Sequence, residues 1–157
     1  MTVSRLALAM AVAGIVATGC SSTASSSSPA SAAGITTQWF AATAGKFLVQ
    51  GAILQKYNEV GASNSPLGSP ISNEQAGPGG GRYTKFEGGG IYWTPQTGAH
   101  IVMGAIRDTW KHDYGGPGGP LGYPTRDQQD IPGGWRQTFQ HGTITYTNGK
   151  THVQPQP

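Results

Sequence analysis

Leu67-Gly68-Ser69-Pro70 and Leu121-Gly122-Tyr123-Pro124 are two versions of one segment, and they lie 54 residues apart. Other landmarks recur in the same order at nearly the same spacing: Gly51-Ala52-Ile53 with Gly104-Ala105-Ile106, Gly79-Gly80-Gly81 with Gly133-Gly134, Phe86 with Phe139, and Ile91 with Ile144. Self-similarity at a fixed period is the signature of a repeat architecture. The sequence therefore predicts one domain built from a unit that occurs twice.

Each unit begins with a helical pattern and ends with a strand pattern. Ile53, Tyr57 and Val60 recur at the spacing of one helix face, and glycine follows them. The Leu-Gly-x-Pro segment is typical of a turn. Two short strands around a glycine-containing turn come next, at residues 82–86 and 91–94 in the first copy and 135–139 and 143–147 in the second. The predicted fold class is α+β, and each unit is a short helix, a Leu-Gly-x-Pro turn and a β-hairpin.

The first residues have the pattern of an export signal. Arg5 precedes a short apolar run, and small residues precede Cys20, the only cysteine. The run is shorter than the roughly 20 residues that a membrane-spanning helix needs. Val16-Ala17-Thr18-Gly19-Cys20 resembles a bacterial lipoprotein box, which implies cleavage before Cys20 and a lipid on its sulfur. The alternative is a plain signal peptide with a leftover thiol. If a lipid on Cys20 is the anchor, Cys20→Ala should release the protein into the medium.

These patterns divide the chain into six segments. We expect a lipoprotein signal peptide at 1–19, a tether with lipidated Cys20 at 20–33, a capping segment at 34–50, the first repeat at 51–103, the second at 104–150 and a tail at 151–157. The tether is almost entirely Ser, Ala and Thr, which bury too little apolar surface to order themselves. It is expected to hold the repeats away from the membrane.

Composition argues against nucleic-acid binding and against most kinds of catalysis. The chain has ten Lys and Arg and seven Asp and Glu, and these charges are scattered. A nucleic-acid-binding protein concentrates its basic residues in a patch or stripe. The four histidines lack the spacing of a zinc motif: His100, His112, His141 and His152. The sequence also lacks a Gly-x-Ser-x-Gly motif, so we expect no catalytic residue, no metal and no cofactor.

Carboxylates and aromatic side chains are the remaining candidates for a functional site. A pair of carboxylates can cleave a glycoside, and the candidates are Glu74, Glu87, Asp108, Asp127 and Asp130. Because Glu74 and Asp127 follow the two Leu-Gly-x-Pro turns, a structural role is favoured for them. Four Trp and six Tyr are a better functional clue, because aromatic faces offer apolar contact next to hydrogen-bonding groups. We assign to the core Phe86, Trp93, Trp110, Phe139 and Tyr146. We assign to a ligand-binding surface Tyr83, Tyr92, Tyr123 and Arg136.

The repeated segments resemble a known family. Gly104-Ala105-Ile106, Pro120-Leu121-Gly122-Tyr123-Pro124 and Phe86-Glu87-Gly88-Gly89-Gly90-Ile91-Tyr92-Trp93 resemble LGFP repeats, which occur on surface proteins of mycolic-acid-bearing actinobacteria. The resemblance covers residues 51–149. Ser69 departs from it, since the family carries an aromatic residue at that position.

The resemblance implies a place in the cell envelope. LGFP repeats are linked to association with the arabinogalactan–peptidoglycan wall. The expected function is therefore a non-catalytic lipoprotein that binds wall polysaccharide from the outer face of the cell membrane. One alternative is an accessory protein that docks on an envelope enzyme without binding sugar, and another is a very small hydrolase. Repeats bury their faces only against neighbours, so a homo-oligomer is also expected.

Overall fold

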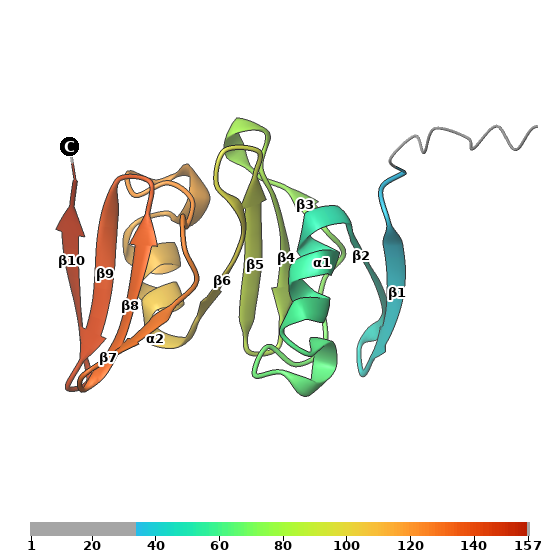
Figure 1. Ribbon diagram of the computed structural model, residues 1–157, viewed down its shortest axis with the longest axis horizontal. Helices are drawn as coiled ribbons and strands as arrows, with labels where there is room; N and C mark the ends of the chain where they lie inside the picture. The colour runs from blue at the N-terminus through green and yellow to red at the C-terminus, as the bar shows by residue number, and fades with distance from the viewer. Residues whose placement is uncertain (1–33, 157) are drawn as a thin grey trace, which may run out of the picture. The chain divides into compact units, whose positions relative to one another are not determined.

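Residues 34–156 are described in the computed structural model, and they belong to one unit spanning Ala33–Pro157. The predicted signal peptide, tether and lipidated Cys20 lie outside the described residues. The main elements in chain order are β1 (Thr37–Ala42), β2 (Gly45–Gln50), α1 (Gly51–Glu59), β3 (Gln75–Ala76), β4 (Arg82–Phe86), β5 (Gly89–Thr94), β6 (Gly98–Met103), α2 (Gly104–Asp108), β7 (Gln129–Ile131), β8 (Gly134–Phe139), β9 (Gly142–Thr147) and β10 (Lys150–Pro155) (Figure 1). Short 3-10 turns cover Ala62–Asn64, Pro78–Gly80 and Gly116–Gly118, and a π-helical turn, Thr109–Asp113, continues α2.

The strands form three antiparallel sheets. β1 pairs with β2 alone, and the two larger sheets have the orders β3-β4-β5-β6 and β10-β9-β8-β7. The repeated hairpins predicted from sequence are confirmed as β4–β5 and β8–β9. The fold is mostly β-sheet with two short helices, so the α+β expectation overstated the helical share. Strands β1, β2, β3, β6, β7 and β10 add to the two predicted hairpins.

The C-terminal residues correct the expected boundary of the second repeat. Residues 151–157 were expected to form a tail, yet Lys150–Pro155 is strand β10 and pairs with β9 along its full length. Val153, opposite Ile144, packs against the second core. A segment rich in Gln, His and Pro is a poor strand candidate on propensity. The segment forms a strand because its backbone pairs with β9, and the propensities of its residues do not predict this pairing.

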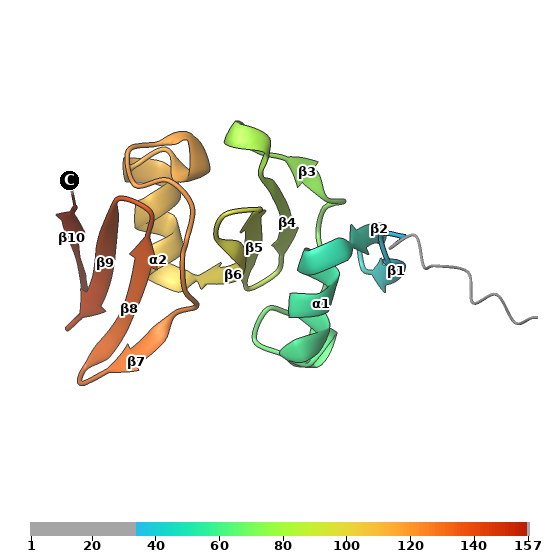
Figure 2. The same cartoon turned by 45° about the horizontal axis from the view of Figure 1, so that its top comes forward.

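The helices lie between the sheets, and each layer interface holds one core (Figures 1 and 2). Helix α1 contacts β2 on one side and β5 and β6 on the other, whereas α2 contacts β6 and β9. The buried residues of the first core are Val49, Ile53, Leu54, Tyr57, Leu67, Phe86, Ile91 and Ile101. Those of the second core are Tyr92, Val102, Ile106, Trp110, Leu121, Tyr123, Phe139 and Ile144. The middle sheet thus contributes one face to each core.

The N-terminal hairpin β1–β2 occupies the place that β5–β6 occupies in the next layer. Both hairpins lead through a glycine with a φ of 56°, Gly51 or Gly104, into a helix. Phe40 of β1 meets Tyr57 of α1 edge to face, with ring centroids 5.0 Å apart. In the next layer Tyr92 meets Trp110 in the same way at 4.7 Å. The expected capping segment is therefore the second half of a sheet, and the described residues contain no counterparts of β3 and β4 before it.

Matching hydrogen bonds join each layer to the next. The Asn73 Oδ1 accepts a hydrogen bond from the Leu48 amide at 2.8 Å, and the Asp127 Oδ1 accepts one from the Ile101 amide at 2.9 Å. Leu48 and Ile101 are equivalent strand positions, because each precedes its helix by the same number of residues. Asp127 therefore corresponds to Asn73 and not to Glu74. The partner of Glu74 in the second repeat is Gln128.

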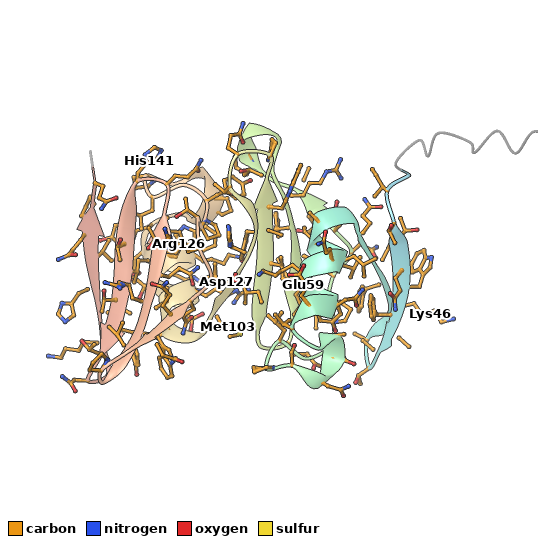
Figure 3. All side chains as sticks on the ribbon, in the orientation of Figure 1. Lys46, Glu59, Met103, Arg126, Asp127 and His141 are labelled. Atoms are coloured by element: carbon orange, nitrogen blue, oxygen red, sulfur yellow. The ribbon has the colours of Figure 1, made fainter. Side chains whose placement is uncertain are left out.

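The Asp127 carboxylate also makes electrostatic contacts with side chains of the first repeat. Its Oδ2 lies 2.6 Å from the Nζ of Lys56, and its Oδ1 lies 3.4 Å from the Nδ1 of His100. Figure 3 labels Asp127 where the two repeats meet. Burial by itself would raise the pKa of this carboxyl, but the interactions with His100, Lys56 and the Ile101 amide lower it from 3.8 to about 2. Lys56 is on α1 and Ile101 is on β6, so one carboxylate joins a helix and a strand of the first repeat to the loop before β7.

This depressed pKa predicts acid sensitivity with a defined sign. A carboxyl that binds its proton more weakly when folded stabilises the folded state above pH 3.8, and the contribution disappears as the pH falls to about 2. Asp127→Asn should therefore flatten the fall of unfolding temperature over that interval. Asp108→Asn is the matched control, because the Asp108 carboxylate is mostly exposed and its contact with Arg107 is long, at 3.9 Å. Equal acid profiles for Asp127→Asn and the unaltered protein would contradict this role.

Candidate functional site

The structure places two of the four predicted ligand-binding residues inside the protein. Tyr92 and Tyr123 are 1% and 4% exposed and belong to the second core. The prediction that Tyr92 faces outward is wrong, because α2 covers the face of the sheet that carries it. Burial raises the pKa of the Tyr92 hydroxyl, an effect that nearby Arg107 opposes. Both faces of the middle sheet are covered, and strand alternation alone does not show this.

Tyr123 is a contact between the two repeats. Its hydroxyl donates a hydrogen bond to the carbonyl oxygen of Pro78 at 2.8 Å. A Cβ at Gly77 or Gly81 would overlap this hydroxyl, so the glycines make room for the ring. Burial raises the pKa of the Tyr123 hydroxyl above its usual value. The aromatic residue of the second Leu-Gly-x-Pro turn thus packs into the loop before β4 and does not form a binding surface.

The other two predicted residues lie on different sheets. Tyr83 is partly buried and stacks on Tyr92, with ring centroids 5.7 Å apart. Arg136 is exposed on the last sheet, at the position equivalent to Tyr83. It lines a shallow polar depression with Thr143, Thr145 and Gln154. The four predicted residues therefore do not form one site.

The depression is on the face of the last sheet that has no helix against it in the described part of the chain. Equivalent positions of the middle sheet carry Tyr83, Tyr92 and Val102, and those residues pack toward α2. In the last sheet they become Arg136, Thr145 and Gln154. Terminal units of repeat proteins need a polar outer face to remain soluble. The exchange of apolar for polar residues lets the array end at this sheet.

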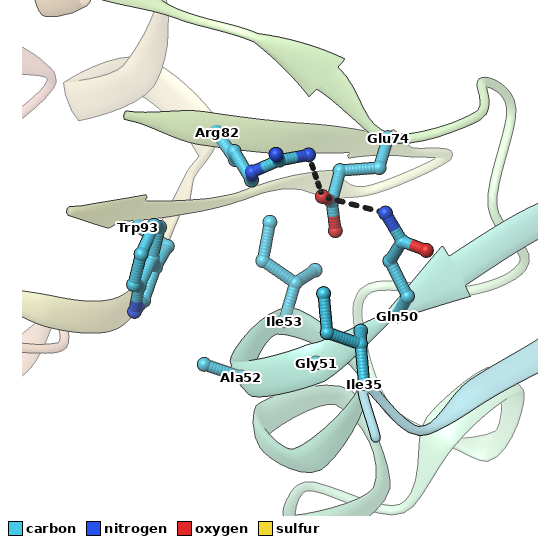
Figure 4. A pocket seen from close by; sticks show the side chains of 8 residues that line it. All are labelled: Ile35, Gln50, Gly51, Ala52, Ile53, Glu74, Arg82 and Trp93. Carbon is cyan, nitrogen blue, oxygen red and sulfur yellow. Dashed lines mark hydrogen bonds and ion pairs between the residues drawn. The ribbon is translucent and has the colours of Figure 1, made fainter. Parts of the chain in front are cut away.

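A different pocket lies at the first repeat (Figure 4). It encloses about 200 Å³ between the start of α1, the end of β2 and strands β4 and β5. Its lining residues are Ile35, Gln50, Gly51, Ala52, Ile53, Glu74, Arg82 and Trp93. Trp93 stands at one end of the group and Glu74 at the other, with Ile53 between them. Aliphatic and aromatic walls with a few polar groups at one end are typical of small-ligand sites.

The polar end of this pocket is organised around the Glu74 carboxylate. Its Oε1 accepts hydrogen bonds from the Arg82 guanidinium at 3.0 Å and from the Gln50 amide at 3.2 Å. The Glu74 side chain is only 6% exposed, whereas that of Arg82 is 51% exposed. A buried carboxylate needs such donors, because an unpaired buried charge is costly. Arg82 retains free N–H groups toward solvent, and its planar group has five donors in all.

Backbone hydrogen bonds fix the position of Glu74. Its amide donates to the carbonyl oxygen of Leu48 at 3.2 Å, and the preceding Asn73 accepts from the Leu48 amide. The hairpin β1–β2 and the first repeat therefore build the pocket together. The site depends on the N-terminal hairpin, because Gln50 and Ile35 come from that segment.

The second repeat has the same backbone and different chemistry at this place. Glu74, Arg82 and Trp93 correspond to Gln128, Trp135 and Tyr146. The rings of Trp135 and Tyr146 stack on each other with centroids 5.6 Å apart and planes at 16°. The charged pair is absent from this second position. The pocket with a carboxylate and a guanidinium is thus a property of the first repeat.

Sequence reasoning found parts of this site and missed its composition. Trp93 was assigned to the core, and it is partly exposed at the edge of the first core. Glu74 was considered only as a carboxylate candidate, while Arg82 and Gln50 were not singled out. When the two repeats are aligned at the 54-residue spacing of their Leu-Gly-x-Pro turns, Glu74 corresponds to Gln128. Differences between the two copies at these positions were the signal available in the sequence.

Comparison with known proteins gives one result that covers most of the described chain. A model of the LGFP repeat matches residues 67–119 and 121–155. Curated proteins gave no match to the chain. Within residues 34–156, no helix is long and apolar enough to cross a membrane, and no three His, Cys, Asp or Glu side chains gather as metal ligands.

Proposed function

Because this chain belongs to the LGFP repeat family, we propose that it is a non-catalytic cell-envelope protein that binds wall glycan, arabinogalactan or peptidoglycan. Membership of the family is consistent with a cell-wall-associated repeat protein. We assign glycan binding to the pocket between Trp93 and Glu74. We further propose that the recurring unit of the family in this chain is the helix, the Leu-Gly-x-Pro turn and the hairpin that follows.

The observation that carries this proposal is the pairing of an aromatic side with a hydrogen-bonding end in one pocket. A sugar ring has apolar C–H faces and a rim of hydroxyl groups. Trp93 offers an apolar surface to such a face. The buried Glu74 carboxylate and the half-exposed Arg82 offer an acceptor and donors to hydroxyl groups. The volume of about 200 Å³ favours a terminal or protruding sugar over a long segment of polymer.

The proposed absence of catalysis rests on the groups that line the pocket. Glycoside cleavage uses two carboxyl groups on either side of the scissile bond. Glu74 is the one carboxylate among the lining residues, and Arg82 and Gln50 already occupy its Oε1. No second carboxylate lines the pocket opposite Glu74 to complete such a pair. This arrangement supports recognition of hydroxyl groups without bond cleavage.

The membrane anchor remains part of the proposal. Cys20 follows a signal-like segment and precedes a Ser- and Ala-rich stretch. Stable membrane attachment needs at least two acyl chains or an equivalent second signal. A diacylglyceryl group on Cys20 would meet that need on the outer face of the cell membrane. The protein would then join the membrane to the wall polymer.

The proposal is tested by sedimentation of residues 33–157 with insoluble cell wall stripped of mycolic acids. Saturable pelleting is expected with this wall and not with cellulose or chitin. Trp93→Ala should weaken binding by up to roughly tenfold, since an aromatic contact contributes about 0.5–1.5 kcal/mol and 1.4 kcal/mol corresponds to a factor of ten. Tyr146→Ala is the matched control, because Tyr146 is the equivalent position in the second repeat. Equal losses for the two variants, or no pelleting at all, would overturn the assignment.

Glu74→Gln separates the polar end from the aromatic wall. The second repeat carries Gln128 at this position, so the fold accommodates the amide. The variant should bind wall several-fold more weakly while its unfolding temperature changes little. If the variant instead unfolds early, the carboxylate serves the structure. Crosslinking in intact cells then tests the rival function, an accessory protein that docks on an envelope enzyme.

A further inference from the structure

Strand β1 has one unpaired edge, which distinguishes it from its equivalents. In the middle sheet β5 pairs with both β4 and β6, and in the last sheet β9 pairs with both β8 and β10. Strand β1 corresponds to β5 and β9, yet among the described residues it pairs with β2 alone. An isolated two-stranded hairpin is marginally stable in water. No described strand occupies the position beside β1 that β4 occupies beside β5.

The phase of the hydrogen bonds shows which groups face that edge. The Gly51 amide donates to the Thr36 carbonyl oxygen at 2.8 Å, so residues 36 and 51 form a hydrogen-bonded pair. Antiparallel ladders alternate, so Thr37, Trp39 and Ala41 direct their N–H and C=O groups away from β2. The outer edge of β2 is already covered, since Asn73 and Glu74 bond both backbone groups of Leu48. Within residues 34–156, the β1 edge of this hairpin has no strand partner.

The side chains of β1 do not protect this edge. The strand reads Thr-Gln-Trp-Phe-Ala-Ala and contains no charge, no proline and no glycine. Proteins usually block an exposed edge with lysine, proline or a bulge. Trp39 is 62% exposed and Ile35, just before the strand, is 67% exposed. On the face opposite α1, β1 thus contributes Thr37, Trp39 and Ala41 without a charge, and Lys46 of β2 lies one strand away from the edge. The last sheet, in contrast, ends the array at the other side with a polar face.

We propose that the β1 edge is a self-association site at which two copies of this chain pair their β1 strands antiparallel. The resulting sheet, with order β2-β1-β1-β2, has four strands, like the other two sheets of the chain. A two-fold axis places the same strand on both sides, so the interface is self-complementary. An uncharged strand meets its copy without repulsion between like charges. The Trp39 side chains of the two copies would lie on this shared sheet.

Residues 33–157 contain both cores and are the material for the test. Light scattering across a concentration series should show twice the mass of one chain, falling to a single chain on dilution. Ala41→Pro should abolish the dimer, because the N–H that proline lacks points to the free edge and not to β2. Trp39→Lys should do the same by placing a charge on the shared sheet. Trp135→Lys alters another exposed tryptophan and should leave the dimer intact.

Hydrogen exchange gives a second readout at the backbone. The amides of Thr37, Trp39 and Ala41 should exchange slowly in the dimer and lose protection on dilution, while the amide of Phe40 stays protected by β2. A single-chain mass at every concentration would overturn the proposal, and the edge would then be open to a strand of another protein. A dimer that persists in both Ala41→Pro and Trp39→Lys would overturn it too. Unchanged unfolding temperatures in the monomeric state show that both variants fold.

Discussion

Replacing Trp110 with alanine is expected to lower the free energy of unfolding by about 3–5 kcal/mol, the largest stability loss in this chain. The Trp110 side chain is completely buried. It contacts Tyr92 edge to face and Phe139 at a centroid distance of 5.2 Å. Its indole N–H donates to the Gly122 carbonyl oxygen at 3.1 Å. The substitution therefore leaves a cavity and an unpaired carbonyl at the same place.

Urea denaturation measures this loss, and Trp135→Ala is its control. Trp135 is 44% exposed and stacks on Tyr146 at the edge of the last sheet. Its replacement should cost about 1 kcal/mol, because only part of its surface leaves water. Trp110 joins the middle sheet to the last sheet, so the last sheet is expected to lose its protection from hydrogen exchange first. Equal costs for the two tryptophans would contradict the core assignment.

Gly81→Ala is the second large effect, expected at about 3 kcal/mol. An added Cβ would overlap the hydroxyl and the ring of Tyr123, which lies against this glycine. The ring would have to leave its place between the repeats and lose the hydrogen bond to Pro78. Overpacking by one methyl group typically costs 1–3 kcal/mol, and the lost hydrogen bond adds about 1 kcal/mol. Thermal unfolding of the variant measures the sum.

Two further variants separate the clash from other effects of glycine replacement. At Gly79 an added Cβ meets nothing within 4 Å, although its φ of 62° strains a side chain. Gly79→Ala should therefore cost only about 1 kcal/mol. In a Tyr123→Ala background Gly81→Ala should lose most of its effect, since the clashing ring is gone. An undiminished cost in that background would show that Gly81 matters for another reason.

The hairpins were predictable because their signals are local. Ile91 and Trp93 alternate with Tyr92 in β5, and Ile144 alternates with Thr145 in β9, with glycine at each turn. Strand β10 was not predictable in this way. Its polar residues and its terminal proline resemble a tail, and only the ladder with β9 makes them a strand. Edge strands gain their structure from a partner, so their own sequence carries a weak signal.

The candidate site was predicted only in part, for a physical reason of the same kind. Aromatic residues were expected to bind ligand, and the sequence offered Tyr83, Tyr92 and Tyr123 as outward-facing candidates. Tyr92 became a core residue because a helix from the following repeat covers its face. Trp93, its neighbour, is partly exposed beside Glu74 and Arg82. Which of two adjacent aromatics reaches solvent depends on the packing of another unit.

The sequence by itself determined the two-fold repeat, the hairpins and the family, because periodicity, alternation and motif are properties of neighbouring residues. The tertiary structure decided which face of each sheet is covered. It also showed that Glu74, Arg82 and Gln50 come together at one pocket while Asp127 replaces Asn73 at the joint between layers. These outcomes depend on contacts between segments far apart in the chain. The energies of these contacts come from burial and hydrogen bonding between layers. Local sequence patterns do not determine which layers pack against each other.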